Sequence, residues 1–228
     1  MSVVKEFDVS SLCGRVIVIT GHFGCGKTNI AVNLAERAVS RSETYLIDFD
    51  NVNPYFRSAD SKRELEAFGV RAVVPEFANT NVDIPAVSPL VYSAISAVHD
   101  GATVMIDVGG DMLGAVSVGS LKERIISLPH TVVYVFSAYR PLTDTPEKAY
   151  TVLKEIEKAS GLTADFLINN SNIGEETSVE NIESSSDYSD ELCRLSGLPL
   201  LFTSYMTDLP PKVRGDILKL ENKTKKLF

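Results

Sequence analysis

Cysteine is scarce in this chain, and its three cysteines lie far apart. Cys13, Cys25 and Cys193 form no C-x-x-C pair, so the sequence predicts neither a disulfide framework nor a zinc site. A few scattered cysteines without a disulfide framework are typical of proteins in a reducing compartment. We therefore expect a cytoplasmic protein.

Long apolar runs are missing as well. No stretch approaches the roughly 20 apolar residues that a membrane-spanning helix needs, and the first ten residues, MSVVKEFDVS, lack the apolar centre of a signal peptide. The segment 212–228 has six basic residues against two acidic ones and could form a short amphipathic helix. Such an end is more often an ordinary surface helix than a membrane contact, so membrane contact is not expected.

Positive charge is also in short supply. The 22 lysines and arginines face 30 aspartates and glutamates, which leaves a net charge of −8. General nucleic-acid binding requires a basic face and is therefore not expected. No linker or internal repeat divides residues 1–228, and this length suits a single α/β domain.

The clearest motif is GHFGCGKT at residues 21–28, which matches the phosphate-loop pattern G-x-x-x-x-G-K-[ST] in full. An apolar strand is predicted over about 15–20, and a helix over about 27–40. Strand, glycine loop and helix together would place phosphates at a helix N-terminus, where the dipole favours anions. The alternative is a glycine-rich turn that binds nothing. The predicted nucleotide-binding residues of this segment are Gly21, His22, Phe23, Gly24, Cys25, Gly26, Lys27, Thr28 and Asn29.

Within this loop, Lys27 is expected to reach the β- and γ-phosphates, and the Thr28 hydroxyl is expected to bind Mg²⁺. Cys25 lies near a helix N-terminus, which could acidify its thiol. We favour the simpler interpretation that Cys25 is a small residue that fits the loop. The predicted unit is thus a single nucleotide-binding domain over residues 1–228.

Acidic residues end two of the predicted strands. Asp48 and Asp50 follow a strand over 44–49, and Asp107 ends a strand over 102–107. Side chains two residues apart leave a strand on one face, and at the carboxyl edge of a parallel sheet they would face the phosphate site. Asp48 and Asp50 could therefore position an attacking water, while Asp50 and Asp107 could support Mg²⁺. The alternative is a set of polar strand ends with turns.

Two glycines follow Asp107, and the N–H of Gly109 or Gly110 could sense a γ-phosphate. Asp111 has no role that the pattern defines, beyond support of the site or contact with a partner. Further along the chain, Thr145 predicts the start of a helix, and Thr177 with Glu180 predicts a capping box. Other strands are expected at 131–137, 166–170 and, as the last, 198–203. The alternation predicts a three-layer α/β fold with a mostly parallel sheet and helices on both faces.

With these motifs in place, the chain resembles the deviant P-loop ATPases of the ParA/MinD type, in the class that also holds nitrogenase iron protein and the CobQ/CobB enzymes. The resemblance covers nearly the whole chain. It is carried by GHFGCGKT at 21–28, DFD at 48–50, DVGG at 107–110 and NN at 169–170. Together with NPYFR at 53–57, the chain looks like a group of small, largely uncharacterised bacterial ParA/MinD-like proteins.

The resemblance implies a sheet of seven or eight strands, ATP and Mg²⁺ as ligands, and a homodimer that encloses the nucleotides. It implies that Asn169 contacts the base, with Asn170 as the second choice. The segment NNSN at 169–172 has neither the lysine nor the aspartate of the guanine-reading N-K-x-D motif. This favours ATP over GTP.

One position departs from the ParA/MinD pattern. Those proteins carry a second lysine directly after the first loop glycine, whereas this chain has His22. Histidine is charged only below about pH 6.5 unless its surroundings shift the pKa. Arg57 could act as an arginine finger in place of that lysine, or could be an ordinary surface charge.

Three functions fit these residues. The first is a slow ATPase that works as a switch on an unidentified protein partner. The second is an ATP-dependent ligase or kinase of the dethiobiotin synthetase or CobB type, with a substrate pocket lined from the 75–92 loop. That loop has no cluster of arginine and lysine for an anionic substrate, which favours the switch. The third is a nucleotide-binding partner protein whose hydrolysis is too slow to matter.

Overall fold

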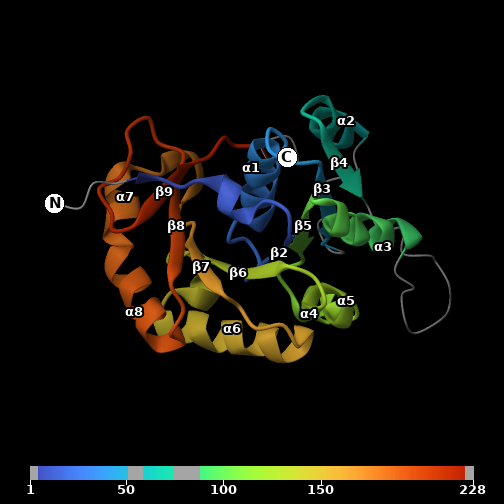
Figure 1. Cartoon of the computed structure of the whole chain (residues 1–228). Coiled ribbons are helices and arrows are strands. Elements are labelled where there is room, and N and C mark those ends of the chain that lie inside the picture. The colour runs from blue at the N-terminus through green and yellow to red at the C-terminus, as the bar shows by residue number, and fades with distance from the viewer. Residues whose placement is uncertain (1–4, 51–58, 74–87, 224–228) are drawn as a thin grey trace.

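A parallel β-sheet runs through the centre of the structure, a computed structural model that describes residues 5–50, 59–73 and 88–223 (Figure 1). In these ranges the strands are β1 (Lys5–Glu6), β2 (Val16–Gly21), β3 (Thr44–Phe49), β4 (Val70–Val73), β5 (Thr103–Val108), β6 (His130–Phe136), β7 (Phe166–Asn169), β8 (Leu200–Tyr205) and β9 (Asp216–Lys219). Their order is β1-β9-β8-β7-β6-β2-β5-β3-β4. Every pair of neighbours is parallel.

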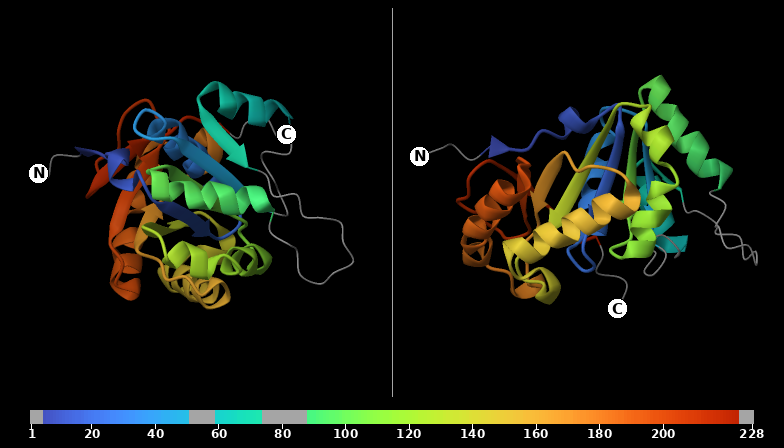
Figure 2. Two further views of the ribbon diagram at one scale, coloured as in Figure 1. Left: turned by 45° about the vertical axis from the view of Figure 1, so that its right-hand side comes forward. Right: turned by 90° about the horizontal axis from the view of Figure 1, so that it is seen from below.

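Helices cover both faces of the sheet. The α-helices of the described ranges are α1 (Lys27–Ala38), α2 (Ala59–Ala67), α3 (Pro89–Ser96), α4 (Met112–Gly119), α5 (Lys122–Ile126), α6 (Pro146–Ser160), α7 (Val179–Ser184) and α8 (Ser186–Ser196). In Figure 1, α1 lies above the central strands and α4, α5 and α6 lie below them. The right-hand view of Figure 2 shows α6 in front of the strands, with the sheet between it and α1.

The layers follow from the alternation of side chains along each strand. On β2, Val16 and Val18 point into the core under α3, α4 and α6, whereas Ile17 and Ile19 point into the core under α1. Both sets are fully buried, as expected for a parallel sheet that is covered on both faces. The strand is therefore apolar throughout, because each of its faces meets a helical layer.

The predicted three-layer α/β fold is confirmed, with two differences at one edge of the sheet. The described residues contain nine strands instead of seven or eight. The strand expected at 198–203 is β8, and it is not the last, because β9 follows it. The extra strands are β1 and β9, which pair with each other and extend the sheet beyond β8.

The prediction of a helix in the segment 212–228 is wrong for its described part. Residues 216–219 form β9, in which Ile217 and Leu218 are buried. Pairing with β8 and burial of two apolar side chains outweigh local propensity in so short a segment. The residues that follow β9, 220–223, then run along α1.

Polar side chains of α1 hold this last described segment, which we call the strap (residues 220–223). The Asn33 side chain accepts from the Glu221 N–H and donates to the Glu221 carbonyl, both at 2.9 Å. Asn29 Oδ1 accepts from the Lys223 N–H at 2.9 Å. The Lys223 ammonium lies 3.0 Å from a carboxylate oxygen of Glu36. The strap thus runs antiparallel to α1, towards the helix N-terminus that the phosphate loop joins.

Helix starts were partly predictable. The Thr145 side chain accepts from the Lys148 N–H and caps α6, as predicted. The capping box predicted at Thr177 and Glu180 is wrong by one position, since Ser178 and Asn181 form it at the start of α7. Both boxes have suitable residue types, and only the observed backbone turn distinguishes them.

Candidate functional site

The phosphate loop joins β2 to α1 and requires glycine at two points. At Gly21 (φ +150°), an added Cβ would lie 2.2 Å from the Val135 carbonyl oxygen on β6. At Gly26 (φ +84°), it would lie 2.2 Å from Asn170 Nδ2. Neither space nor backbone conformation admits another residue without rearrangement. The loop is therefore fitted between the ends of β6 and β7.

Asn170 braces this loop from the end of β7. Its side-chain amide donates to the Cys25 carbonyl at 2.7 Å, and its Oδ1 accepts from the Ser204 hydroxyl at 2.5 Å. Cys25 itself is buried, and burial raises the pKa of its thiol above the ordinary value. The interpretation of Cys25 as a residue that fits the loop is thereby supported over that of an acidified thiol.

Lys27 and Thr28 are the first two residues of α1, and their side chains have different hydrogen-bond partners. Lys27 is buried, and its ammonium donates to the His22 carbonyl within the loop at 3.1 Å. The Thr28 hydroxyl donates to Asp107 Oδ2 at 2.6 Å. The structure therefore brings together the predicted cation, the predicted hydroxyl and the carboxylate at the end of β5.

Two buried carboxylates stand side by side at this edge of the sheet. Asp48 on β3 pairs in register with Asp107 on β5, and both are almost fully buried. Burial, and next the negative charge of Asp48, raise the pKa of Asp107 from 3.8 to about 7, against the opposing effects of Thr28 and Lys27. The N–H of Asp50 donates to Asp48 Oδ1 at 3.0 Å, so all three predicted carboxylates gather at one place.

The glycines after β5 pack against the phosphate loop. A Cβ on Gly110 would lie 2.5 Å from backbone atoms of Phe23 and 2.8 Å from Lys27 Nζ. Asp111 then caps α4, because its Oδ1 accepts from the Gly114 N–H at 2.8 Å. The role left open for Asp111 is therefore structural here, and the β5–α4 turn is in contact with the lysine of the loop.

The predicted asparagines are engaged within the protein. Asn169 is buried, its amide donates to Ser185 Oγ at 2.9 Å, and its Oδ1 accepts from the backbone and hydroxyl of Ser171. Contact with a base stays a prediction and would require these bonds to be exchanged. Asn29 is likewise buried and holds the strap. Arg57 lies outside the described residues.

The residues present fit a magnesium ion that is held jointly with phosphates. In the described ranges, no group of three or more His, Cys, Asp or Glu side chains could hold a metal by itself. Mg²⁺ commonly takes only one or two protein ligands beside phosphate oxygens and water. Buried Asp107 Oδ1 has no hydrogen-bond partner among the described residues, and Thr28 Oγ1 adjoins the other oxygen of this carboxylate. Thr28 and Asp107 are therefore the residues best placed to support the ion.

Sequence reasoning missed Arg140, which follows β6. Its Nε, Cζ and Cδ lie 3.7, 3.8 and 3.9 Å from the position of a Cβ on Gly24. The signal was a basic residue shortly after the carboxyl end of the strand that neighbours β2 in a parallel sheet. That β6 lies next to β2 depends on the order of strands in the sheet, which the sequence alone does not give.

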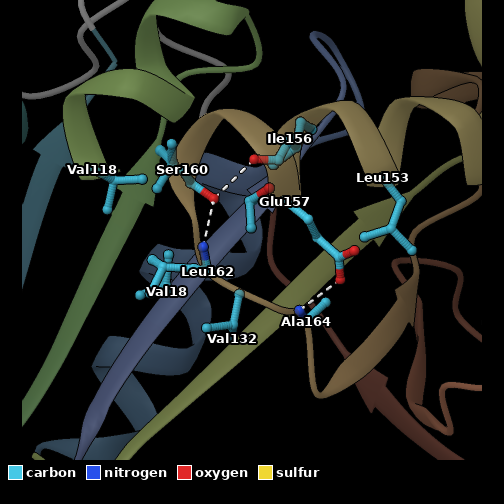
Figure 3. A pocket seen from close by; sticks show the side chains of 11 residues that line it. Val18, Val118, Val132, Leu153, Ile156, Glu157, Ser160, Leu162 and Ala164 are labelled. Atoms are coloured by element: carbon cyan, nitrogen blue, oxygen red, sulfur yellow. Dashed lines mark hydrogen bonds between the residues drawn. The ribbon is translucent and has the colours of Figure 1, made fainter. Parts of the chain in front are cut away.

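A small apolar cavity lies elsewhere, between α6 and the sheet (Figure 3). Its volume of about 10 Å³ is close to the space of one water. Val18, Val132 and Leu153 are among its lining residues, and it lies under α6 on the face opposite α1. The cavity is a packing defect and not a nucleotide site.

No family model and no curated protein matches this sequence. Solved structures do match. The signal recognition particle 54 kDa protein of Aeropyrum pernix K1, in complex with GDP, aligns with a TM-score of 0.56 and 14% identity over 83% of this chain and 41% of that one. FtsY of Mycoplasma mycoides aligns with a TM-score of 0.53 and 19% identity over 86% of this chain and 61% of that one.

A third match is the cell division protein FtsY of Thermotoga maritima, with a TM-score of 0.50 and 17% identity over 82% of this chain and 60% of that one. This chain therefore spans between about two fifths and three fifths of these proteins. At such identities the likeness is one of fold. The chain has the three-layer α/β fold of P-loop NTPases. Among the described residues, no helix is long and apolar enough to cross a bilayer.

Proposed function

We propose that this protein binds ATP with Mg²⁺, hydrolyses it slowly and acts as a nucleotide-driven switch on a protein partner in the cytoplasm. The observation that carries the proposal is the convergence of Lys27, Thr28 and Asp107 at the phosphate loop. A cation, a hydroxyl and a carboxylate at a helix N-terminus are what a magnesium–phosphate ligand requires. The choice of ATP over GTP is supported by the absence of the guanine-reading N-K-x-D motif at 169–172.

Each residue has a defined part in this proposal. The Lys27 ammonium exchanges the His22 carbonyl for phosphate oxygens, and the loop N–H groups bind the same phosphates. Thr28 and Asp107 would hold Mg²⁺, which would supply charge neutralisation for phosphoryl transfer. Asp48 or Asp50 accepts a hydrogen bond from the attacking water and orients it.

The switch itself is the turn after β5. Because Gly110 packs against Phe23 and lies near Lys27 Nζ, a phosphate that draws Lys27 away changes what this turn contacts. The turn leads directly into α4, whose Met112, Leu113 and Val116 are 50%, 67% and 57% exposed. These side chains form an apolar surface beside the site, suited to a second copy of the chain or to the partner. Movement of α4 would then make the affinity of this apolar surface depend on which nucleotide is bound. We expect the ATP-bound protein to be a homodimer.

The test combines nucleotide binding, turnover and mass in solution. We expect ATP with Mg²⁺, but not ADP, to convert the protein to a dimer. Lys27→Ala removes charge-assisted bonds to phosphate worth about 1.5–3 kcal/mol, so affinity should fall roughly 10- to 100-fold. Lys158→Ala, at an exposed position on α6, is the matched control.

Three results would count against the proposal in different ways. Failure of the wild type to bind ATP removes the nucleotide site. Binding without any change of mass removes the dimer. A protein that turns over ATP only when a small acid or alcohol is added would be a ligase or kinase instead. That pocket was predicted from the 75–92 loop, of which residues 75–87 lie outside the described ranges.

A further inference from the structure

Arg140 occupies a fixed place beside the phosphate loop. It stands between β6 and the short 3-10 helix Pro141–Thr143, and its carbonyl accepts from the Thr143 N–H at 2.9 Å. The preceding residue, Tyr139, donates its hydroxyl to the Asn181 carbonyl at 2.6 Å. The backbone that carries Arg140 is thus tied both to the following turn and to α7.

The guanidinium of Arg140 lies against the loop at Gly24. Its Nε and Cζ are 3.7 and 3.8 Å from the position of a Cβ on that glycine. The charge of Arg140 also acts on the thiol of Cys25, whose pKa it lowers against the dominant effect of burial. Both observations place a positive charge beside the phosphate loop.

This cation has no counterion among the residues that the structure describes. Arg140 Nε is buried without a hydrogen-bond partner, and none of the ion pairs found in the described ranges includes Arg140. The chain has an excess of acidic residues, so the lack of a pair does not reflect a shortage of carboxylates. A buried N–H group without an acceptor is unfavourable unless a ligand supplies one.

We propose that Arg140 is the second cation of the phosphate site and binds the β- and γ-phosphate oxygens of a nucleoside triphosphate. The inference rests on the proposed nucleotide function. A planar guanidinium can bind two phosphate oxygens through two parallel N–H groups, a fixed geometry that an ammonium lacks. Arg140 would thus supply from within the same chain the charge for which His22 is a weak source.

The test compares the affinities for ATP, ADP and AMP of the wild type and of Arg140→Gln. We expect affinity for ATP to fall about 10- to 100-fold, because bonds between charged groups are lost. The loss for ADP should be smaller, and affinity for AMP should not change. Arg140→Lys should recover part of the loss, since it restores charge without the bidentate geometry. Arg124→Gln is the matched control, because that guanidinium lies 4.7 Å over the Tyr92 ring on α3, away from the loop.

A purely structural role for Arg140 predicts a different pattern. In that case Arg140→Gln would lower the melting temperature without nucleotide and weaken ATP, ADP and AMP alike, which would overturn the inference. Unchanged ATP affinity in Arg140→Gln, together with loss of binding in Lys27→Ala, would overturn it while the proposed function stands. A wild type that binds no nucleotide would overturn both.

Discussion

The phosphate loop and the carboxylate group of Asp48, Asp50 and Asp107 meet at the same edge of the sheet but are built differently. The loop is held by close packing and by a hydrogen bond from Asn170, the residue that follows β7. The carboxylate group brings like charges together where they are buried. Burial and repulsion disfavour the charged form of Asp107 and so raise its pKa. The loop thus has its shape without a ligand. The carboxylates repel one another without a ligand, and a bound cation would reduce this repulsion.

This difference suggests a division of labour. In the proposed site, a loop with a fixed shape would position the phosphate, because little freedom would be lost when the anion binds. The carboxylate group would instead make the site sensitive to charge. Its electrostatic energy depends on protonation, on a bound metal ion and on the ammonium of Lys27. The contrast predicts that changes in the loop act through geometry at every pH, and that changes in the carboxylate group act through charge.

The largest effect is expected from Gly21→Ala in the loop. The new Cβ would clash with the Val135 carbonyl at 2.2 Å and also occupy a disfavoured φ. We expect the free energy of unfolding to fall by roughly 3 kcal/mol or more, measured by denaturant titration.

Gly101→Ala is the control for this change. Gly101 also has a positive φ, +86°, but nothing lies within 4 Å of its added Cβ. It should therefore lose only about 1 kcal/mol or a little more from backbone strain. Equal losses in the two variants would show that close packing is not what defines the loop.

A smaller effect, dependent on pH, is expected from Asp107→Asn. The pKa of Asp107 rises from 3.8 in the unfolded chain to about 7 in the fold, so between these values the folded protein binds more protons. Its free energy of unfolding should consequently fall as pH rises from about 4 to about 7, and then level off. The amide introduced by Asp107→Asn does not ionise, so the variant should lose this slope and be more stable than the wild type at pH 8. The gain is at most roughly 4 kcal/mol, since the pKa rises by about three units and one unit corresponds to about 1.4 kcal/mol.

The measurement is unfolding across that pH range without Mg²⁺ or nucleotide. Glu123→Gln, at an exposed position on α5, should keep the wild-type slope. If Asp107→Asn keeps that slope as well, the carboxylate group is not the sensitive half of the site.

The smallest of these effects is expected from Asn170→Ala, which leaves the Cys25 carbonyl without its 2.7 Å donor. A loss of about 1–2 kcal/mol is expected for a buried bond of this kind. Amide hydrogen exchange should accelerate in the loop more than in β6, because the brace acts locally. Asn172→Ala removes a bond to the Asn170 carbonyl and should leave loop exchange unchanged. Slow loop exchange in both variants would mean that glycine packing alone holds the loop.

Much of this site was readable in the sequence because local patterns define it. The spacing of Gly21, Gly26, Lys27 and Thr28 predicted a loop between a strand and a helix, and the structure has β2 and α1 there. Asp107 was predictable because an apolar strand that ends in acid places that acid at the carboxyl edge of a parallel sheet.

The parts that were missed depend on contacts distant in sequence. Arg140 reaches the loop only because β6 neighbours β2. β9 exists because β8 and β1 offer edges to it, while its own four residues carry a weak signal. The bonds of Asn169 to Ser171 and Ser185 likewise could not be predicted from the sequence, while its contact with a base stays a prediction.

The strap on α1 has a consequence for the order of events during synthesis. Asn29 and Asn33 are buried polar residues, and the groups that satisfy them come from Glu221 and Lys223. Lys223 leaves the ribosome 194 residues after Asn29, which at roughly 5–20 residues per second is about 10–40 s later. Helix α1, which follows the phosphate loop, is therefore made well before the segment that completes its polar face. In a nascent chain, the side chains of Asn29 and Asn33 would find these partners only after the strands between have been made.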